Sequence, residues 1–113
     1  MMGFVLAAVL AASPTSVGLG MREYRYSVYR SSVHAGTVAF NMTNFGEDAH
    51  NLRISGPGGY RSAVSRDVEP GGGHLRFVVH LRRAGTYTLV CLKPGHEAKG
   101  MKAKLRVTRR HAR

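Results

Sequence analysis

The residues best suited to chemistry lie in one short segment near the C-terminus, Cys91-Leu-Lys-Pro-Gly-His96-Glu-Ala-Lys-Gly-Met101. Cys91 is the only cysteine among 113 residues, and a further histidine, His50, opens an alternating apolar run upstream. Thiolate, imidazole and thioether suit copper, and two His and one Cys with a weak axial Met serve both Cu(I) and Cu(II). We therefore predict that His50, Cys91, His96 and Met101 bind one copper ion. A lone cysteine buried in a strand as a small apolar residue is the alternative for Cys91.

The spacing Cys-x4-His-x4-Met resembles the ligand loop of azurin-like and rusticyanin-like cupredoxins, the type 1 blue-copper proteins. Residues 85–91, Gly-Thr-Tyr-Thr-Leu-Val-Cys, are similar to the strand that delivers the thiolate in small bacterial cupredoxins. Residues 35–44, followed by His50-Asn51, resemble the strand and loop that deliver the first histidine. The likeness covers residues 24–107. It implies a cupredoxin fold, electron transfer by cycling between Cu(I) and Cu(II), and an Asn51 that ties the two ligand loops together.

Apolar and polar residues alternate along most of the chain. The alternation is clear at residues 38–43, 50–54, 75–81, 87–91 and 101–107, and Gly- and Pro-rich turns at 56–59 and 70–73 separate some of these runs. Short alternating strands with such turns predict an all-β protein, a Greek-key β-sandwich of about seven to eight strands. Cys91 would end one strand and Met101 begin the next, so the loop between them gathers three ligands at one end of the sandwich. His50 must reach that end from another strand.

Charge marks one boundary in the chain, because the first 20 residues carry no Lys, Arg, Asp or Glu. We expect an export signal peptide at 1–20, the copper-binding domain at 21–108 and a basic tail at 109–113. The apolar stretch 1–12 is shorter than the roughly 20 residues that span a bilayer. It also lacks the positive charge that usually opens a signal peptide, so a buried first strand or helix is the alternative. The expected location is outside the cytoplasm, periplasmic or secreted, with no membrane span.

The chain is strongly basic, with a net charge of +11 and seven basic but no acidic residues from Lys99 to Arg113. A solvated strand face with a basic tail accounts for many such runs. The functional interpretation is a surface that steers an acidic redox partner protein. We find no nucleic-acid recognition motif and expect a monomer that binds no nucleic acid. Outside the predicted site lie His34, His74, His80 and His111, which we interpret as surface side chains, with a second exchangeable copper site as the alternative.

Electron transfer by a single copper ion is the leading functional hypothesis. An enzyme is disfavoured. The resemblance implies that a multicopper oxidase would carry His beside the Cys, whereas here the neighbours are Val90 and Leu92. No paired carboxylates or nucleophile and base stand out. Two alternatives stay open. One is an extracytoplasmic copper carrier or buffer that uses the same four residues. The other is a metal-free β-sandwich that binds an anionic partner.

Overall fold

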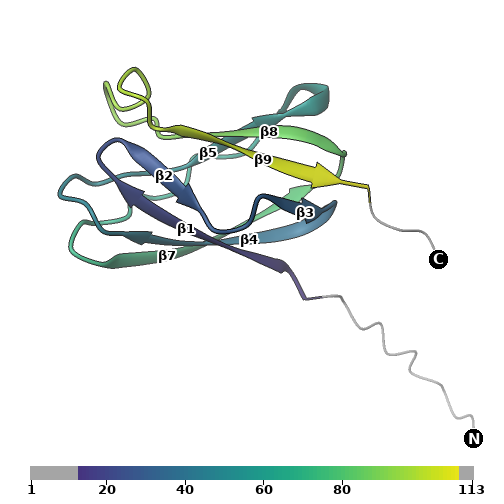
Figure 1. Ribbon diagram of the computed structural model, residues 1–113, viewed down its shortest axis with the longest axis horizontal. Helices are drawn as coiled ribbons and strands as arrows, with labels where there is room; N and C mark the ends of the chain where they lie inside the picture. The colour runs from purple at the N-terminus through teal and green to yellow at the C-terminus, as the bar shows by residue number, and fades with distance from the viewer. Residues whose placement is uncertain (1–12, 110–113) are drawn as a thin grey trace, which may run out of the picture.

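Two β-sheets packed face to face make up the described part of the chain, residues 13–109 of the computed structural model (Figure 1). One sheet has the strand order β2-β1-β4-β7 and the other β3-β9-β8-β5-β6. The pairs β1–β4 and β3–β9 are parallel, and the remaining pairs are antiparallel. The strands are β1 (Thr15–Arg22), β2 (Arg25–Val28), β3 (Ser32–His34), β4 (Gly36–Asn44), β5 (Arg53–Gly56), β6 (Tyr60–Arg61), β7 (Gly73–Leu81), β8 (Gly85–Val90) and β9 (Lys102–Thr108).

The predicted all-β sandwich is confirmed, and the described residues contain no α-helix, only the 3-10 turn Pro57–Gly59. The nine strands exceed the predicted seven to eight. The difference arises partly because β3 and β6, of three and two residues, are too short to display an alternating pattern. Among the described residues, no helix is long and apolar enough to cross a membrane.

The core lies between the sheets and consists of the inward positions of the alternating runs. In the first sheet Val17 of β1 pairs with Phe40 of β4, and both are fully buried. In the second sheet Ile54 of β5 pairs with Leu89 of β8, and both are again fully buried. Close-packed side chains of this kind resist rearrangement. The sandwich therefore gives the loops at its end a rigid support.

The start of the domain differs from the prediction. β1 begins at Thr15, and its inward residues Val17, Leu19 and Met21 are at most 1% exposed. The predicted boundary after residue 20 therefore falls inside a core strand, and the domain begins at or before Thr15. The remainder of the predicted signal peptide, 1–12, and most of the predicted tail, 110–113, lie outside the described residues and stay predictions.

Glycines on the outward side of β1 explain why its sequence does not predict a strand. Gly18 and Gly20 lie between the inward residues of the strand, and Gly20 is itself buried, so the middle of β1 shows no polar alternation. The side chain of Tyr29 covers this side. A Cβ atom at Gly18 would lie 2.8 Å from its ring, and one at Gly20 would lie 2.7 Å from its hydroxyl oxygen. A strand whose outward positions hold glycine beneath an aromatic ring looks like the small-residue end of a signal peptide.

Candidate metal centre

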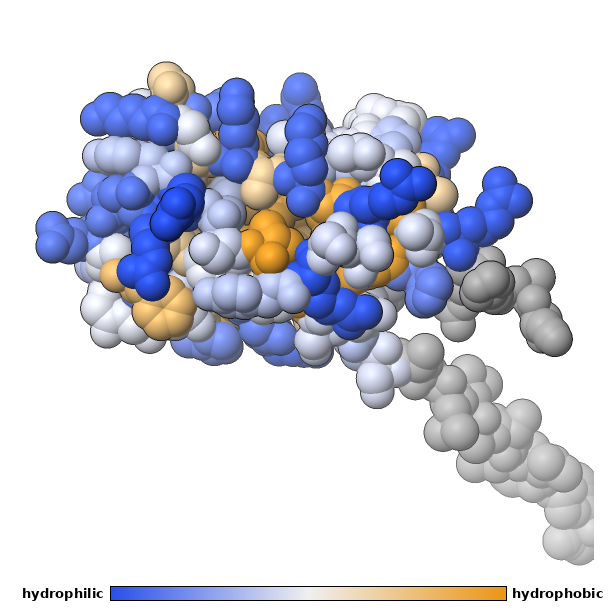
Figure 2. Space-filling view, viewed as in Figure 1, coloured by the Kyte–Doolittle hydropathy of each residue, from blue (hydrophilic) through white to orange (hydrophobic). Residues whose placement is uncertain are grey.

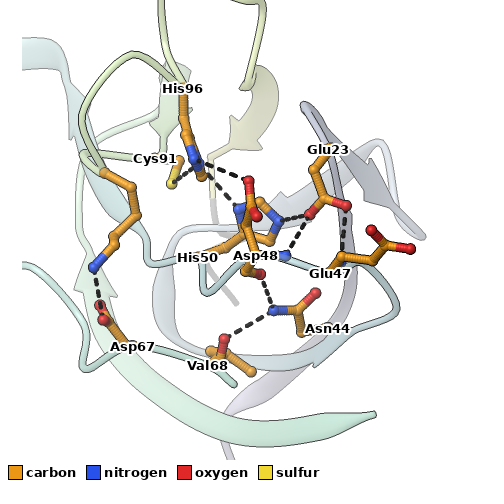
Figure 3. A network of polar contacts seen from close by, with 10 residues as sticks. Glu23, Asn44, Glu47, Asp48, His50, Asp67, Val68, Cys91 and His96 are labelled. Carbon is orange, nitrogen blue, oxygen red and sulfur yellow. Dashed lines mark hydrogen bonds and ion pairs between the residues drawn. The ribbon is translucent and has the colours of Figure 1, made fainter. Parts of the chain in front are cut away.

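Three of the four predicted ligands converge at one end of the sandwich (Figure 3). Nδ1 of His50 lies 3.2 Å from Nδ1 of His96, and that atom lies 3.5 Å from Sγ of Cys91. One ligand atom from each of the three residues lies within 4.8 Å of the others. His50 and Cys91 are fully buried, and His96 is 9% exposed. This is the one group of its kind found between residues 13 and 109.

Cys91 and Met101 lie where two paired strands separate, as the alternation predicted. Cys91 directly follows β8, and Met101 directly precedes β9. The Cys91 N–H donates to the Met101 carbonyl at 3.2 Å, so the two residues face each other at the base of the loop. The Met101 N–H donates to the His96 carbonyl at 3.0 Å, and Met101 is fully buried. The fourth predicted ligand thus borders the same loop.

The tight path of this loop depends on two glycines. Gly95 has a φ of 81° and Gly100 a φ of 106°, both in the left-handed region that side chains with a Cβ seldom adopt. Between them the Gly100 N–H donates to the Glu97 carbonyl at 2.9 Å and the Lys99 N–H to the His96 carbonyl at 3.1 Å. These bonds fold the chain back so that His96 lies above Cys91.

His50 is placed by a loop and not by the strand that the alternation predicted. β5 begins at Arg53, while His50 forms an isolated bridge with Val68, with N–H to carbonyl distances of 3.2 and 2.7 Å. The next residue, Asn51, joins the two ligand loops, since its Oδ1 accepts a hydrogen bond from the Leu92 N–H at 2.8 Å. This is the role that the resemblance implied for Asn51.

A buried tyrosine supports the same junction. The hydroxyl of Tyr26 in β2 donates to the Asn51 carbonyl at 2.5 Å. Burial, and then the nearby Cys91 thiol, raise the pKa of Tyr26 above its ordinary value. The phenol therefore stays protonated and keeps its role as a donor.

Two carboxylates that the sequence did not single out face the outer nitrogens of the imidazoles. Glu23 Oε2 lies 2.8 Å from His50 Nε2, and Asp48 Oδ2 lies 3.6 Å from His96 Nε2. Glu23 also accepts the N–H groups of Asp48 and Glu47 at 3.0 and 2.8 Å, and these bonds lower the pKa of Glu23 to about 2. Glu23 and His50 are 27 residues apart, so no local pattern signals the contact.

The protonation state of His96 favours metal binding, because its environment favours the neutral imidazole. Burial lowers the pKa of His96, and the neighbouring His50 lowers it further, against the opposing effect of Asp48 and Glu23. A neutral imidazole keeps a lone pair for a metal ion, whereas imidazolium does not. At neutral pH His96 is thus ready to act as a ligand.

The donor set and its spacing fit one copper ion. Metal ions such as Zn²⁺ bind imidazole nitrogen and thiolate sulfur at about 2.0–2.3 Å, so one ion can bridge atoms separated by 3.2 and 3.5 Å. Two imidazoles, a thiolate and a nearby thioether, with no carboxylate in the inner group, suit copper better than hard cations. The other described histidines, His34, His74 and His80, are exposed, and each ring lies beside a threonine hydroxyl.

Known structures share this architecture. An auracyanin from Roseiflexus castenholzii, reduced with dithionite, is 21% identical, covers 86% of this chain and 99% of its own, and has a TM-score of 0.68. Rusticyanin from Thiobacillus ferrooxidans is 23% identical over 85% of this chain and 79% of its own, with a TM-score of 0.63. A blue copper oxidase from Nitrosomonas europaea is 18% identical over 89% of this chain and 41% of its own, with a TM-score of 0.65. At these identities the similarity establishes the fold.

The family is established by the sequence itself. No curated protein sequence matches the chain. The family model of copper-binding proteins of the plastocyanin/azurin family, however, matches residues 15–108, from the first residue of β1 to the last of β9. With the converging His50, Cys91 and His96, this match shows that the chain is a cupredoxin, a copper-binding member of the plastocyanin/azurin family.

Proposed function

We propose that this cupredoxin is a mononuclear type 1 copper protein that carries single electrons between redox partners. His50, Cys91 and His96 would hold the ion as three close ligands, and Met101 would supply a fourth, weaker sulfur donor. The observation that carries the proposal is the buried convergence of two imidazole nitrogens and one thiolate within 4.8 Å on a β-scaffold. When bound, copper would supply a one-electron Cu(I)/Cu(II) couple. The combination of sulfur and imidazole ligands favours neither oxidation state strongly. The rigid loops keep the ligands in place in both states.

The same surroundings support a carrier and not an enzyme. Val90 and Leu92 flank Cys91, so no imidazole beside the thiolate leads toward a second metal ion. The blue copper oxidase shares its fold with this chain over only 41% of its own length, so most of the oxidase has no counterpart in the matched region. We assign no catalytic residue.

His96 is the ligand through which electrons would enter and leave, because it is the one nearest to solvent. It is 9% exposed, whereas His50 and Cys91 are fully buried. The ring of Tyr24 packs edge-on against it at 5.0 Å, and Lys99 lies 4.8 Å from the centre of the Tyr24 ring. A partner that contacts this end of the molecule comes within a few side chains of the metal.

An acidic redox partner protein fits the basic outer face of the five-stranded sheet. Lys102 pairs with Val90, which pairs with Arg53, so the first row of this face begins beside the ligand loop. Lys104 and Arg106 continue it along β9 and are exposed. Figure 2 shows hydrophilic side chains projecting along the upper side of the molecule, where β8 and β9 lie in Figure 1. Such a face attracts an acidic protein and raises its encounter rate.

Addition of Cu(II) to the purified apo-protein tests the central proposal. We expect an intense visible band from thiolate-to-copper charge transfer, with the matching electron paramagnetic resonance signal. Cys91→Ala should abolish the band, whereas His74→Ala, which removes an exposed imidazole on β7, should keep it. A colourless product from the wild type, or a band that survives Cys91→Ala, would overturn the assignment.

Copper exchange separates the electron carrier from a copper carrier or buffer. Burial of all three close ligands favours retention of the metal. We expect fast electron self-exchange together with slow loss of copper to a chelator. Release of copper within minutes combined with slow self-exchange would instead support metal handling.

Export from the cytoplasm is the proposed location. The apolar stretch 1–12 supports it. Because β1 contributes buried residues to the core, we propose that any cleavage site lies before Thr15. N-terminal sequencing of the protein from fractionated cells should find a mature chain that begins between residues 11 and 15. An intact N-terminus in the cytoplasmic fraction would contradict export.

A further inference from the structure

We propose that Glu23 is a positioning residue of the metal centre. Its carboxylate holds the proton of His50 on Nε2, leaves Nδ1 as the ligand nitrogen, and stabilises Cu(II) relative to Cu(I) through its negative charge. This inference rests on the proposed copper site, but its first half concerns the metal-free protein and can be tested there.

The carboxylate of Glu23 is held between two segments of the chain. Glu23 lies in the turn between β1 and β2, and it accepts N–H groups from Glu47 and Asp48 in the loop that carries His50. Its third contact, at 2.8 Å, is Nε2 of His50 (Figure 3). An oxygen of an ionised carboxylate accepts hydrogen bonds and does not donate them, so His50 must donate from Nε2. Nδ1 then has a free lone pair, and this is the atom that lies 3.2 Å from Nδ1 of His96.

Gly46 makes room for this arrangement. A Cβ atom at residue 46 would collide with the Glu23 carboxylate, so any larger residue would displace it. The loop therefore combines a small residue at the point of closest approach with two N–H donors aimed at the same carboxylate. These features identify Glu23 as a built contact of His50 and not a chance surface neighbour.

The charge of Glu23 acts mainly on His50. Among residues 13–109, the ion pairs include none between Glu23 and a Lys or Arg. The Glu23 side chain is 25% exposed, which screens it less than Asp48, whose side chain is 48% exposed and lies 3.6 Å from His96. A carboxylate on the outer nitrogen of a metal-bound imidazole raises its basicity as a ligand and orients the ring. A more basic imidazole with a negative carboxylate beside it favours the more highly charged ion, Cu(II).

Nuclear magnetic resonance of the apo-protein at neutral pH tests the positioning. We expect the wild-type His50 ring to carry its proton on Nε2 and to exchange it slowly with water. In Glu23→Ala that exchange should become at least about tenfold faster, because the hydrogen bond is gone. A wild-type His50 protonated on Nδ1, or an unchanged exchange rate in Glu23→Ala, would overturn this half of the proposal. No copper is present, so failure of the proposed electron-carrier function leaves this result intact.

The reduction potential of the copper-loaded protein tests the charge effect. Glu23→Gln should shift the relative affinity for Cu(I) and Cu(II) by about tenfold toward Cu(I), or about 59 mV toward higher potential for one electron. Glu47→Gln is the matched control, since it removes the same charge from the same loop but Glu47 contacts Glu23 through its backbone N–H. Glu23→Asp, which keeps the charge, should remain closer to the wild type than Glu23→Gln does.

Gly46→Ala keeps the test decisive if Glu23→Gln folds poorly. This variant retains the carboxylate but crowds it away from His50, so the potential should rise by a smaller amount than in Glu23→Gln. Thermal unfolding of each apo-variant checks that it folds. A shift in Glu23→Gln no larger than in Glu47→Gln, a shift to lower potential, or an unchanged potential in Gly46→Ala would overturn the charge effect. If the copper-loaded wild type itself formed no blue species, that result would instead count against the proposed function.

Discussion

Met101 is the residue whose contribution can be isolated most cleanly, because leucine nearly matches its volume. Volume-conserving changes in a core usually cost less than about 1.5 kcal/mol, so Met101→Leu should fold. Loss of the axial sulfur lowers donation to Cu(II), and we expect the visible band to persist while the reduction potential rises. Voltammetry measures the shift. Met42→Leu, in the fully buried part of β4, is the control and should leave the potential unchanged.

The four predicted ligands and the two carboxylates near them differ in how far the sequence could identify them. Cys91, His96 and Met101 are unusual donor types at family-like spacing within one segment, and the structure places them around one loop. Glu23 and Asp48 carry carboxylates, which are frequent in any sequence. Their contacts with the imidazoles depend on which turns meet in three dimensions. No one-dimensional pattern encodes that meeting.

Glu23 also gives the apo-protein a defined response to acid. Its pKa falls from 4.5 to about 2 in the folded protein, so its contribution to stability is present above about pH 4.5 and is lost as the pH falls toward 2. We expect the free energy of unfolding of the apo-protein to decrease across this range. Glu23→Gln should flatten the decrease, and chemical denaturation at a series of pH values measures it. An equally steep decrease in Glu23→Gln would contradict the assignment.

At the scale of elements, the alternation of apolar and polar residues predicted the strands that have one buried and one solvent-exposed face. β7 and β9 are examples, since most of their exposed positions carry His, Arg or Lys between buried or half-buried ones. β1 escapes prediction because the middle of its outward side holds Gly18 and Gly20 beneath Tyr29, so both sides look apolar or small there. His50 was assigned to a strand because Leu52 and Ile54 follow at the same period, but its backbone pairs only at Val68. An alternating pattern indicates which residues are buried, and the residues of a buried loop can show the same alternation as a strand.

The junction between the two ligand loops depends on Asn51. Its Oδ1 accepts the Leu92 N–H at 2.8 Å, and this contact is partly buried. Asn51→Ala leaves that donor without its partner, which typically costs about 1–3 kcal/mol. We expect a lower free energy of unfolding and faster copper loss to a chelator. Asn41→Ala, on the outward side of β4 in the other sheet, is the control, and an equal effect of both changes would show that Asn51 has no special role.

At the scale of the whole molecule, positive and negative charges occupy different places. None of the nine described strands contains Asp or Glu. Glu97 lies in the ligand loop, Asp67 forms an ion pair with Lys93 of that loop, and Glu23 and Asp48 face the imidazoles. Glu47 and Glu69 directly neighbour Asp48 and Val68, two residues already placed at this end. The acidic side chains therefore gather around the metal centre, and the sheet faces stay basic.

This distribution predicts how salt and mutation affect electron transfer. With an acidic redox protein as partner, the bimolecular rate should fall as ionic strength rises, because screening weakens the attraction between unlike charges. Reversing Lys102, Lys104 and Arg106 to Glu should lower the rate at low salt by about tenfold or more and flatten its salt dependence. Arg76→Glu, on the outer face of the other sheet, should change the rate much less. Stopped-flow mixing measures these rates. Lys104→Glu alone and Arg76→Glu change the net charge equally, so an equal effect of these two single changes would mean that net charge, and not this face, guides the partner.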